Sequence, residues 1–347
     1  MALLNFFHDH HYFYLFSFIL AFVMSFIFCP IFRAIAIRYN IFDHPDADIK
    51  IHQFATPYLA GASIALAFIL SLIIFYLLSP DQLGLNPTSL IIFSGGLIIV
   101  ALGLVDDIIK GGLSFKIKFA IQFIVSTVFV LFGMQTHFVQ ADWLFYPFAI
   151  IWLIGIMNAI NIIDMMDGLA GSTIIIASLG FLLISLPAEA IYIKLSAALL
   201  AGSTLGYLPF NFSKKNKMFM GDTGSLLAGY ILGVLSLSTH YSSHHAYILA
   251  PVLILGVPIF DTLFVMLLRY RKGISPFRGS KDHSAMRLEK MGYTRYSIVL
   301  IAAATSVSLC GCAWLTTQVG IYESLSICTF ALILFYLTGT WLAKVKI

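Results

Sequence analysis

Apolar residues fill most of the chain in long runs, and short segments between the runs hold nearly all the charged side chains. A run of about twenty apolar residues can cross the hydrocarbon core of a bilayer as an α-helix. The runs do not alternate as membrane β-strands do, and a chain in lipid must satisfy its backbone internally. We therefore expect an all-α, polytopic integral membrane protein with about eleven transmembrane helices. Their predicted ranges are 13–32, 59–79, 88–105, 118–135, 143–162, 170–187, 190–209, 222–239, 246–267, 297–316 and 322–343.

Composition and charge placement add an orientation to this picture. Charged residues are 10% of the 347 residues and hydrophobic residues 60%, whereas soluble domains carry about a quarter charged residues. Of the 20 lysines and arginines, all but Lys194 lie in four loops and the C-terminal tail. Basic loops stay in the cytoplasm, so we expect an outside N-terminus, a cytoplasmic C-terminus and one transmembrane domain over 1–347. The net charge of +4 then reflects topology and indicates no nucleic-acid binding. The four loops are 33–58, 106–118, 211–221 and 268–296.

Carboxylates gather at the predicted cytoplasmic helix ends. The chain has only 16 acidic residues, and five of them are Asp106, Asp107, Asp164, Asp167 and Asp222, in three short segments. Carboxylates near a bilayer are costly and usually mark function. A cluster of them can bind a divalent cation, and the cation can bind phosphate. The pattern predicts an enzyme that moves a phosphorylated group between a soluble donor and a lipid.

The polar residues around these acids leave alternatives open. Asn158, Asn161 and Asp164 are three residues apart and share one helix face, which predicts a polar cavity or, alternatively, a hydrogen-bonded seam between helices. Asp222 or Thr223 suits the N-cap of the following helix, and Asp222 also suits a metal. Asp106 and Asp107 by themselves also fit a solvated helix end.

Basic and polar groups near the acids are candidates for phosphate and nucleotide contacts. Three lysines, Lys110, Lys116 and Lys118, follow the Asp106–Asp107 pair. His283 suits a hydrogen bond to a pyrophosphate oxygen, and the alternative for it is a solvated loop histidine. The further candidates for substrate contacts are Lys50, His52, Asn158, Asn161, Asp167, Asn211, Arg278, Lys281 and Arg287.

Taken together, these segments resemble the polyprenyl-phosphate N-acetylhexosamine-1-phosphate transferase family, which includes bacterial undecaprenyl-phosphate GlcNAc-1-phosphate transferases and the phospho-MurNAc-pentapeptide translocase. The resemblance covers nearly the whole chain in order. Its segments are Asp43-His44-Pro45 through His52, Gly103-Leu-Val-Asp106-Asp107, Asn158 through Gly168, Asn211, Phe219-Met-Gly221-Asp222-Thr-Gly-Ser225 and Pro258-Ile-Phe-Asp261-Thr, followed by the cytoplasmic loop ending at Gly292.

The resemblance implies a phosphotransferase of the EC 2.7.8 class with ten or eleven helices in the bacterial inner membrane and a site facing the cytoplasm. It implies transfer of HexNAc-1-phosphate, with GlcNAc the first candidate, from a UDP-sugar to undecaprenyl phosphate, with release of UMP. Mg²⁺ is the implied cofactor, with Mn²⁺ as the alternative, and a homodimer is the form that relatives suggest. The pathway implied is cell-envelope polysaccharide synthesis of the O-antigen (lipopolysaccharide) or teichoic-acid type.

The resemblance also assigns roles to residues. Asp222 resembles the Mg²⁺ ligand, and Asp106 and Asp107 resemble acids that act on the lipid phosphate or bind metal. Asn161 and Asp164 resemble the active-site and nucleotide-contacting pair. Two lysines, Lys110 and Lys118, resemble lysines near the phosphates, with Lys116 a rival for Lys118. The mechanism is left open between direct attack by the lipid phosphate and an aspartyl-phosphate intermediate.

This chain departs from the family pattern in two places, and the second, the reduced histidine cluster, concerns the donor sugar. The family commonly has Asp-Gly-x-Asp-Gly where this chain has Asp164-Met-Met-Asp167-Gly168, and its His-x-His-His cluster is reduced to His283, with Ala285 and Met286 in the other places. Arg278, Lys281 and Arg287 are expected to take over the pyrophosphate contacts. The loss of histidines argues against the MurNAc-pentapeptide branch. The rival functions are a cation-coupled transporter, which also places acids at membrane depth, and a non-catalytic relative.

Overall fold

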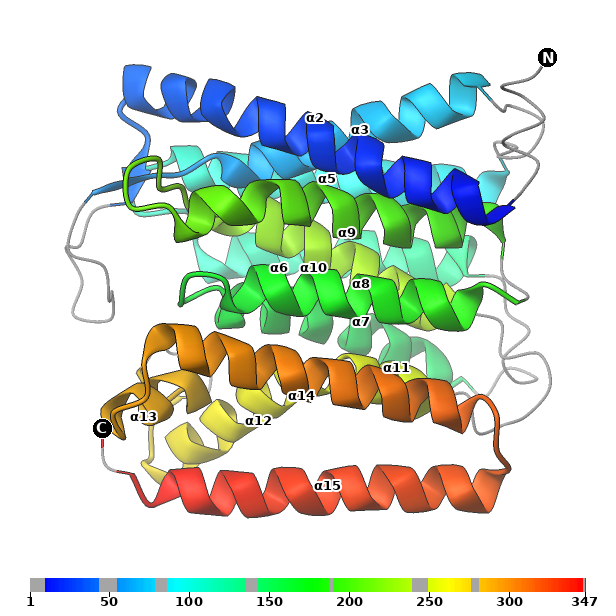
Figure 1. Ribbon diagram of the computed structural model, residues 1–347, viewed down its shortest axis with the longest axis vertical. Helices are drawn as coiled ribbons and strands as arrows, with labels where there is room; N and C mark the ends of the chain where they lie inside the picture. The colour runs from blue at the N-terminus through cyan, green and yellow to red at the C-terminus, as the bar shows by residue number, and fades with distance from the viewer. Residues whose placement is uncertain are drawn as a thin grey trace.

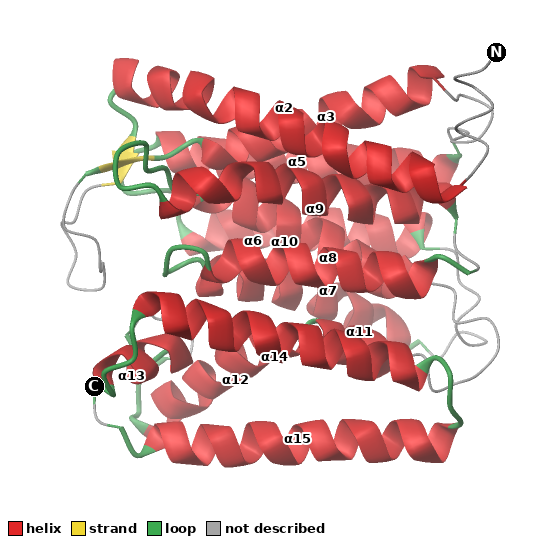
Figure 2. Cartoon of the chain, in the orientation of Figure 1, coloured by secondary structure: helices red, strands yellow, loops and turns green. Residues whose placement is uncertain are grey.

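Long α-helices dominate the computed structural model, which describes residues 10–43, 55–78, 86–134, 143–187, 190–238, 249–275, 281–345 and 347. These residues form thirteen α-helices, one π-helical segment and two short strands (Figures 1 and 2). The elements up to residue 163 are α2 (His10–Arg38), β1 (Phe42–Asp43), β2 (Thr56–Pro57), α3 (Ala60–Leu78), α5 (Pro87–Ile108), α6 (Phe115–Val128), η1 (Phe129–Gly133) and α7 (Phe145–Ile163). The later elements are α8 (Leu169–Ser185), α9 (Ile191–Phe212), α10 (Gly221–Ser238), α11 (Ala250–Ile254), α12 (Gly256–Arg271), α13 (Ser284–Lys290), α14 (Arg295–Thr316) and α15 (Ile321–Ala343).

Short polar residues set where several helices begin. Asn86 accepts a hydrogen bond from the backbone nitrogen of Ser89, with Pro87 as the first helical residue of α5. Ser114 starts α6 and Thr294 starts α14 by the same kind of contact. Such side chains satisfy the backbone donors that a helix start leaves unpaired. Each cap lies two to four residues before a range that the sequence predicts to be helical.

Eight helices of the described residues are long and apolar enough to cross a membrane, namely α2, α3, α5, α6 extended by η1, α7, α9, α14 and α15. The prediction of an all-helical, polytopic membrane protein is therefore confirmed. Eight of the eleven predicted spans correspond to these helices. The other three predicted spans are helical too, as α8, α10 and the pair α11 and α12, but they do not meet that measure of length and hydropathy.

The predicted span 246–267 is broken into α11 and α12 at Leu255. Pro258 has no backbone N–H, so it cannot donate to the carbonyl of Ile254 and continue the first helix. Gly256, the first residue of α12, offers the chain freedom to turn there. As a result α12 is tilted relative to the neighbouring long helices (Figure 1).

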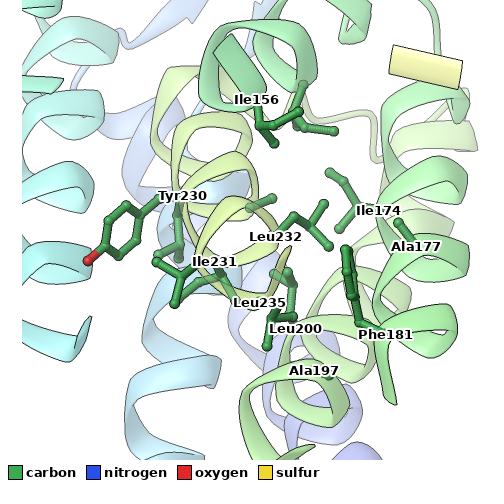
Figure 3. Packing of buried hydrophobic residues seen from close by; sticks show 14 of the residues in the cluster. Ile156, Ile174, Ala177, Phe181, Ala197, Leu200, Tyr230, Ile231, Leu232 and Leu235 are labelled. Carbon is green, nitrogen blue, oxygen red and sulfur yellow. The ribbon is translucent and has the colours of Figure 1, made fainter. Parts of the chain in front are cut away.

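Helix α10 lies inside the bundle and packs against α3, α5, α7, α8 and α9. Most of its residues are buried. In Figure 3, Leu232 and Leu235 lie opposite Ile174 and Phe181 of α8, while Tyr230 points to the other side, where its hydroxyl donates to the carbonyl of Ile92 in α5 at 3.1 Å. A helix that is apolar on all sides must be surrounded by other helices. The buried position of α10 fixes where its first turn, with Asp222, is placed.

The first turn of α10 is pressed against the first turn of α3. A Cβ atom on Gly61 would overlap the backbone nitrogen of Gly224, so neither position has room for a side chain. Small residues allow helices in membranes to approach closely. The backbone nitrogen of Gly61 also donates to the carbonyl of Met220 at 2.9 Å. These contacts hold the start of α10 at one end of the bundle, the end that also carries β1, β2, α13 and the end of α15 (Figure 2).

Candidate active site

Three carboxylates meet at this end of the bundle. Asp106 and Asp107 lie at the end of α5, and Asp222 lies in the first turn of α10. One carboxylate oxygen from each lies within 4.8 Å of the others. Lys118 of α6 reaches the same place, with its Nζ 3.3 Å from Asp106 and 2.9 Å from Asp222. The structure thus brings together acids that are more than a hundred residues apart in the sequence.

Asp107 caps the start of α10 from another helix. Its Oδ1 accepts from the backbone nitrogen of Asp222 at 2.8 Å, and its Oδ2 accepts from the nitrogen and the hydroxyl of Thr223 at 3.0 and 2.6 Å. The expectation that Asp222 or Thr223 is the N-cap is therefore wrong, because a neighbouring helix supplies the cap. Gly221 has a φ of +67°, and a Cβ there would lie 2.6 Å from Asp107. Only glycine leaves room for this carboxylate.

Asp222 and Asp106 are each oriented by a further hydrogen bond. The Nδ2 of Asn161, in α7, donates to Oδ1 of Asp222 at 2.8 Å and to the hydroxyl of Ser225 at 2.9 Å. The backbone nitrogen of Leu113 donates to Oδ1 of Asp106 at 2.6 Å. Four elements, α5, α6, α7 and α10, thus hold the carboxylates and fix their directions.

Asp164 follows the last turn of α7 and contributes a carboxyl group of different character. Burial raises its pKa well above the ordinary value, and the charges of Asp222, Asp107 and Asp167 raise it further. Among the described residues no hydrogen bond or ion pair reaches this carboxylate. A raised pKa means that the group holds its proton to a higher pH than an exposed aspartate does.

The chemistry of the triad fits a divalent cation. Hard cations such as Mg²⁺ are bound by carboxylate oxygens, and three carboxylates facing one lysine leave excess negative charge at this place. Asp106, Asp107 and Asp222 are the residues that would hold the ion. Bound there, it would offset the charge of phosphate groups.

The sequence that contains this site has recognisable relatives. Residues 89–240 match the profile of glycosyl transferase family 4. A probable undecaprenyl-phosphate N-acetylglucosaminyl 1-phosphate transferase of Bacillus subtilis is 33% identical over 295 residues, which are 82% of this chain and 80% of that protein. The chain belongs to glycosyl transferase family 4. It is accordingly a phosphotransferase of the polyprenyl-phosphate sugar-1-phosphate class, as the resemblance predicts.

Other relatives of this transferase are more distant. A decaprenyl-phosphate N-acetylglucosaminephosphotransferase of Mycolicibacterium smegmatis is 28% identical over 305 residues, covering 78% of this chain and 73% of that protein. A phospho-N-acetylmuramoyl-pentapeptide-transferase of Listeria monocytogenes is 29% identical over 248 residues, covering 65% of this chain and 74% of that protein. Each similarity extends beyond the matched family segment.

The structure separates the three candidate lysines of the transferase. Lys118 contacts two acids of the triad. Lys110 and Lys116 are exposed, and neither forms an ion pair within the described part of the chain. Lys116 lies two residues before Lys118. A helix turns by about 100° per residue, so the two side chains point about 200° apart around the axis of α6. Lys118 is therefore the lysine placed at the site.

The sequence left open whether the polar residues of α7 face a polar cavity or a seam between helices, and the structure shows one of each. Asn161 faces Asp222 in the site. Asn158 instead donates to Oε1 of Gln122 in α6 at 2.7 Å and to the carbonyl of Ile154 at 2.8 Å. Gln122 is only 1% exposed, so Asn158 forms an interhelical seam. Gln122 was missed, although a lone amide within an apolar run is a signal for such a partner.

This seam can be tested by substitution. Asn158→Leu leaves the buried Gln122 amide without its partner and is expected to cost about 1–3 kcal/mol of stability. Adding Gln122→Leu removes both polar groups and should restore most of the lost thermal stability in detergent. We expect the double variant to keep its transfer rate within about threefold of the wild type, because neither residue touches the triad. A large loss of transfer in the double variant would instead place Asn158 at the substrate.

Asp167 and Asn211 shape the turn between α7 and α8. Asp167 pairs with Lys217 at 2.5 Å. The Oδ1 of Asn211 accepts from the backbone nitrogen of Gly168 at 2.6 Å, and its Nδ2 donates to the carbonyl of Met218 at 3.2 Å. Both side chains predicted to bind substrate are thus engaged with the protein, next to Asp164.

His283 immediately precedes α13. It is only 6% exposed, so it is not the solvated loop histidine that was the alternative to a phosphate contact. Its Nδ1 is 2.7 Å from Oδ2 of the buried Asp261 in α12. Oδ1 of Asp261 accepts from the backbone nitrogen and the hydroxyl of Ser284 at 2.8 and 2.5 Å. Asp261 thus holds the start of α13, as Asp107 holds the start of α10. Asp261 could have been recognised from the sequence, because an acid inside the predicted span 246–267 is unusual.

The two departures from the family pattern lie in one apolar cluster. Met166 and Ala285 belong to one buried apolar cluster, and Met165 and Met286 pack against it. The methionines that follow Asp164 and the residues that stand in place of histidines therefore belong to the same apolar surroundings. This apolar contact joins α13 to the turn that carries Asp164 and Asp167.

The remaining predicted phosphate ligands are placed differently. Arg287 is 2% exposed, pairs with Asp282 at 2.9 Å and donates to the carbonyls of Leu342 and Val345. Its guanidinium fastens the end of α15, so these contacts do not support a phosphate role. Lys281 is exposed. The three predicted residues outside the described part of the chain are Lys50, His52 and Arg278.

Proposed function

We propose that this transferase moves HexNAc-1-phosphate, with GlcNAc-1-phosphate as the first candidate, from a UDP-sugar to undecaprenyl phosphate and releases UMP. The observation that carries the proposal is the triad of Asp106, Asp107 and Asp222 with Lys118 beside it. Both substrates carry phosphate groups, and phosphoryl transfer depends on positioning and charge neutralisation. The name of the Bacillus subtilis relative supports the choice of sugar and lipid.

In the proposed reaction an oxygen of the lipid phosphate attacks the β-phosphorus of the UDP-sugar. The bond between that phosphorus and the bridging oxygen breaks, and UMP leaves with the electron pair. The lipid phosphate is already an anion near neutral pH, so no strong base is required. Lys118 is placed to pair with phosphate oxygens, and Asp106, Asp107 and Asp222 would hold Mg²⁺, or Mn²⁺ in its place.

The contacts of Asp107 favour direct attack over an aspartyl-phosphate route. Both its oxygens accept hydrogen bonds from α10, so an attack by this carboxylate on phosphorus would pull it away from the start of that helix. Asp106 is similarly engaged by Leu113 and Lys118. Attack by either acid would therefore break contacts that hold the site in place.

The proposed setting is the bacterial inner membrane. We infer eleven spans, an outside N-terminus, a cytoplasmic C-terminus and a site open to the cytoplasm, where a UDP-sugar is available. The clustering of basic residues in the loops next to the site supports this orientation. A homodimer and a role in the first membrane step of cell-envelope polysaccharide synthesis are parts of the same proposal.

The test is UMP release by the purified full-length protein in detergent with Mg²⁺ and undecaprenyl phosphate. We expect lipid-dependent UMP release with UDP-GlcNAc within a panel of UDP-HexNAc donors, and none when the lipid is omitted. Release only with UDP-MurNAc-pentapeptide would move the protein to the branch of its Listeria relatives. Folded protein that releases no UMP with any donor would contradict the proposal.

A further inference from the structure

Lys118 occupies the space between two acids of the triad. Its Nζ lies 3.3 Å from Asp106 and 2.9 Å from Asp222. About a quarter of the lysine side chain is exposed, whereas the two carboxylates are more buried. The ammonium group therefore serves as a counter-charge within the site.

The hydrogen bonds of Asp107 limit where a cation can find ligands. Each carboxylate oxygen has two lone-pair directions. Oδ2 of Asp107 already accepts two hydrogen bonds and Oδ1 accepts one, all from the start of α10. Asp107 has one direction left to offer. A cation held by the triad must take its other protein ligands from Asp106 and Asp222, the two carboxylates that Lys118 touches.

We propose that Lys118 is a built-in competitor of the divalent cation, because both positive charges are held by Asp106 and Asp222 and the cation binds more tightly once the ammonium has moved away from them. Two positive charges within a few ångströms repel each other in a partly buried site, where water screens them less than at an open surface. The flexible four-carbon stem of lysine lets the ammonium move away once it has another anionic partner. A phosphate group of a substrate is such a partner, so metal and phosphate should bind cooperatively. The cooperative part rests on the proposed function.

A matched control exists on the same helix. Lys116 is exposed and has no ion pair in the described part of the chain. Replacing it changes the net charge by the same amount as replacing Lys118, and it leaves the contacts of the triad in place. A difference between the two variants therefore reports the position of the charge rather than its loss.

The primary experiment measures Mn²⁺ binding by electron paramagnetic resonance on the full-length protein in detergent, without substrate. We expect Lys118→Met to bind Mn²⁺ about tenfold more tightly than the wild type, since the competing charge is removed. Lys116→Met should match the wild type within about twofold, because its charge is solvated. Lys118→Met binding no more tightly than Lys116→Met would overturn the proposal. If Lys118→Met does not fold, Lys118→Gln provides the same comparison.

The cooperative part has its own readout. UMP should tighten Mn²⁺ binding more in the wild type than in Lys118→Met. Attraction between metal and phosphate acts in both proteins, but only the wild type gains from moving the ammonium from the acids to the phosphate. Equal tightening in both proteins would overturn the coupling. Mn²⁺ binding without substrate does not depend on turnover. An active wild type with unchanged metal affinity in Lys118→Met thus contradicts this inference alone, whereas an inactive wild type contradicts the proposed function.

Discussion

Replacing Asp222 with asparagine is expected to reduce transfer by about a thousandfold or more while the protein remains folded. Asparagine has nearly the same shape, so its oxygen can still accept the hydrogen bond from Asn161. The substitution removes the negative charge that faces Lys118 and that would hold the metal. UMP release measures the loss of activity, and thermal unfolding in detergent measures the fold.

A suitable control for this variant is Glu289→Gln. Glu289 lies in α13 and pairs with Arg295 at 2.7 Å, so the change is chemically the same but falls outside the triad. We expect it to keep the wild-type rate within about twofold, as surface pairs contribute little. If Asp222→Asn keeps more than about a tenth of the wild-type activity, a loss far below that expected for a metal ligand, Asp222 is not the metal ligand.

Replacing Asp107 with alanine is expected to damage both stability and activity. The change removes three hydrogen bonds at the start of α10. Loss of a helix cap and exposure of unsatisfied donors together cost about 2–4 kcal/mol, a fall of roughly 5–10 °C in the thermal midpoint. Transfer should disappear as well, because Asp222 depends on the first turn of α10 for its position.

Thr223→Val gives the graded comparison for this prediction. It removes only the hydroxyl bond to Asp107 and keeps both backbone donors, so we expect a loss of about 1 kcal/mol and a substantial residual activity. An Asp107→Ala protein that is inactive but as stable as the wild type would show that the carboxylate acts in catalysis without supporting the helix.

The sequence alone predicts most of the acids of the site but only some of the residues that contact them. The acids stand out because charged residues are rare in an apolar chain and gather at predicted helix ends. The family resemblance favours Lys118 and leaves Lys116 as a rival, and the rotation of α6 decides for Lys118. Arg287 and Asn211 look like ligands in sequence, yet their hydrogen bonds run to backbone carbonyls and amides of distant segments. Such partners carry no local pattern.

The departures from the family pattern illustrate the same limit. Met165 and Met286 are 121 positions apart, and nothing in either segment indicates the other. In the fold, both pack against the cluster of Met166 and Ala285. The methionine in place of glycine and the apolar residues in place of histidines therefore meet in one apolar cluster. We infer that it reshapes the surroundings of Asp164 while the triad is untouched.

The sequence by itself determined that the protein is all-helical and lies in a membrane, which family it belongs to, and which acids gather at one end of the bundle. Those properties depend on hydropathy runs, residue type and order, which are local and can be read along the chain. Only the tertiary structure decided that Asp107 caps α10, that Lys118 lies between Asp106 and Asp222, and that Asn158 faces another helix. These depend on helix rotation and close approach, which are set by packing between segments far apart in sequence.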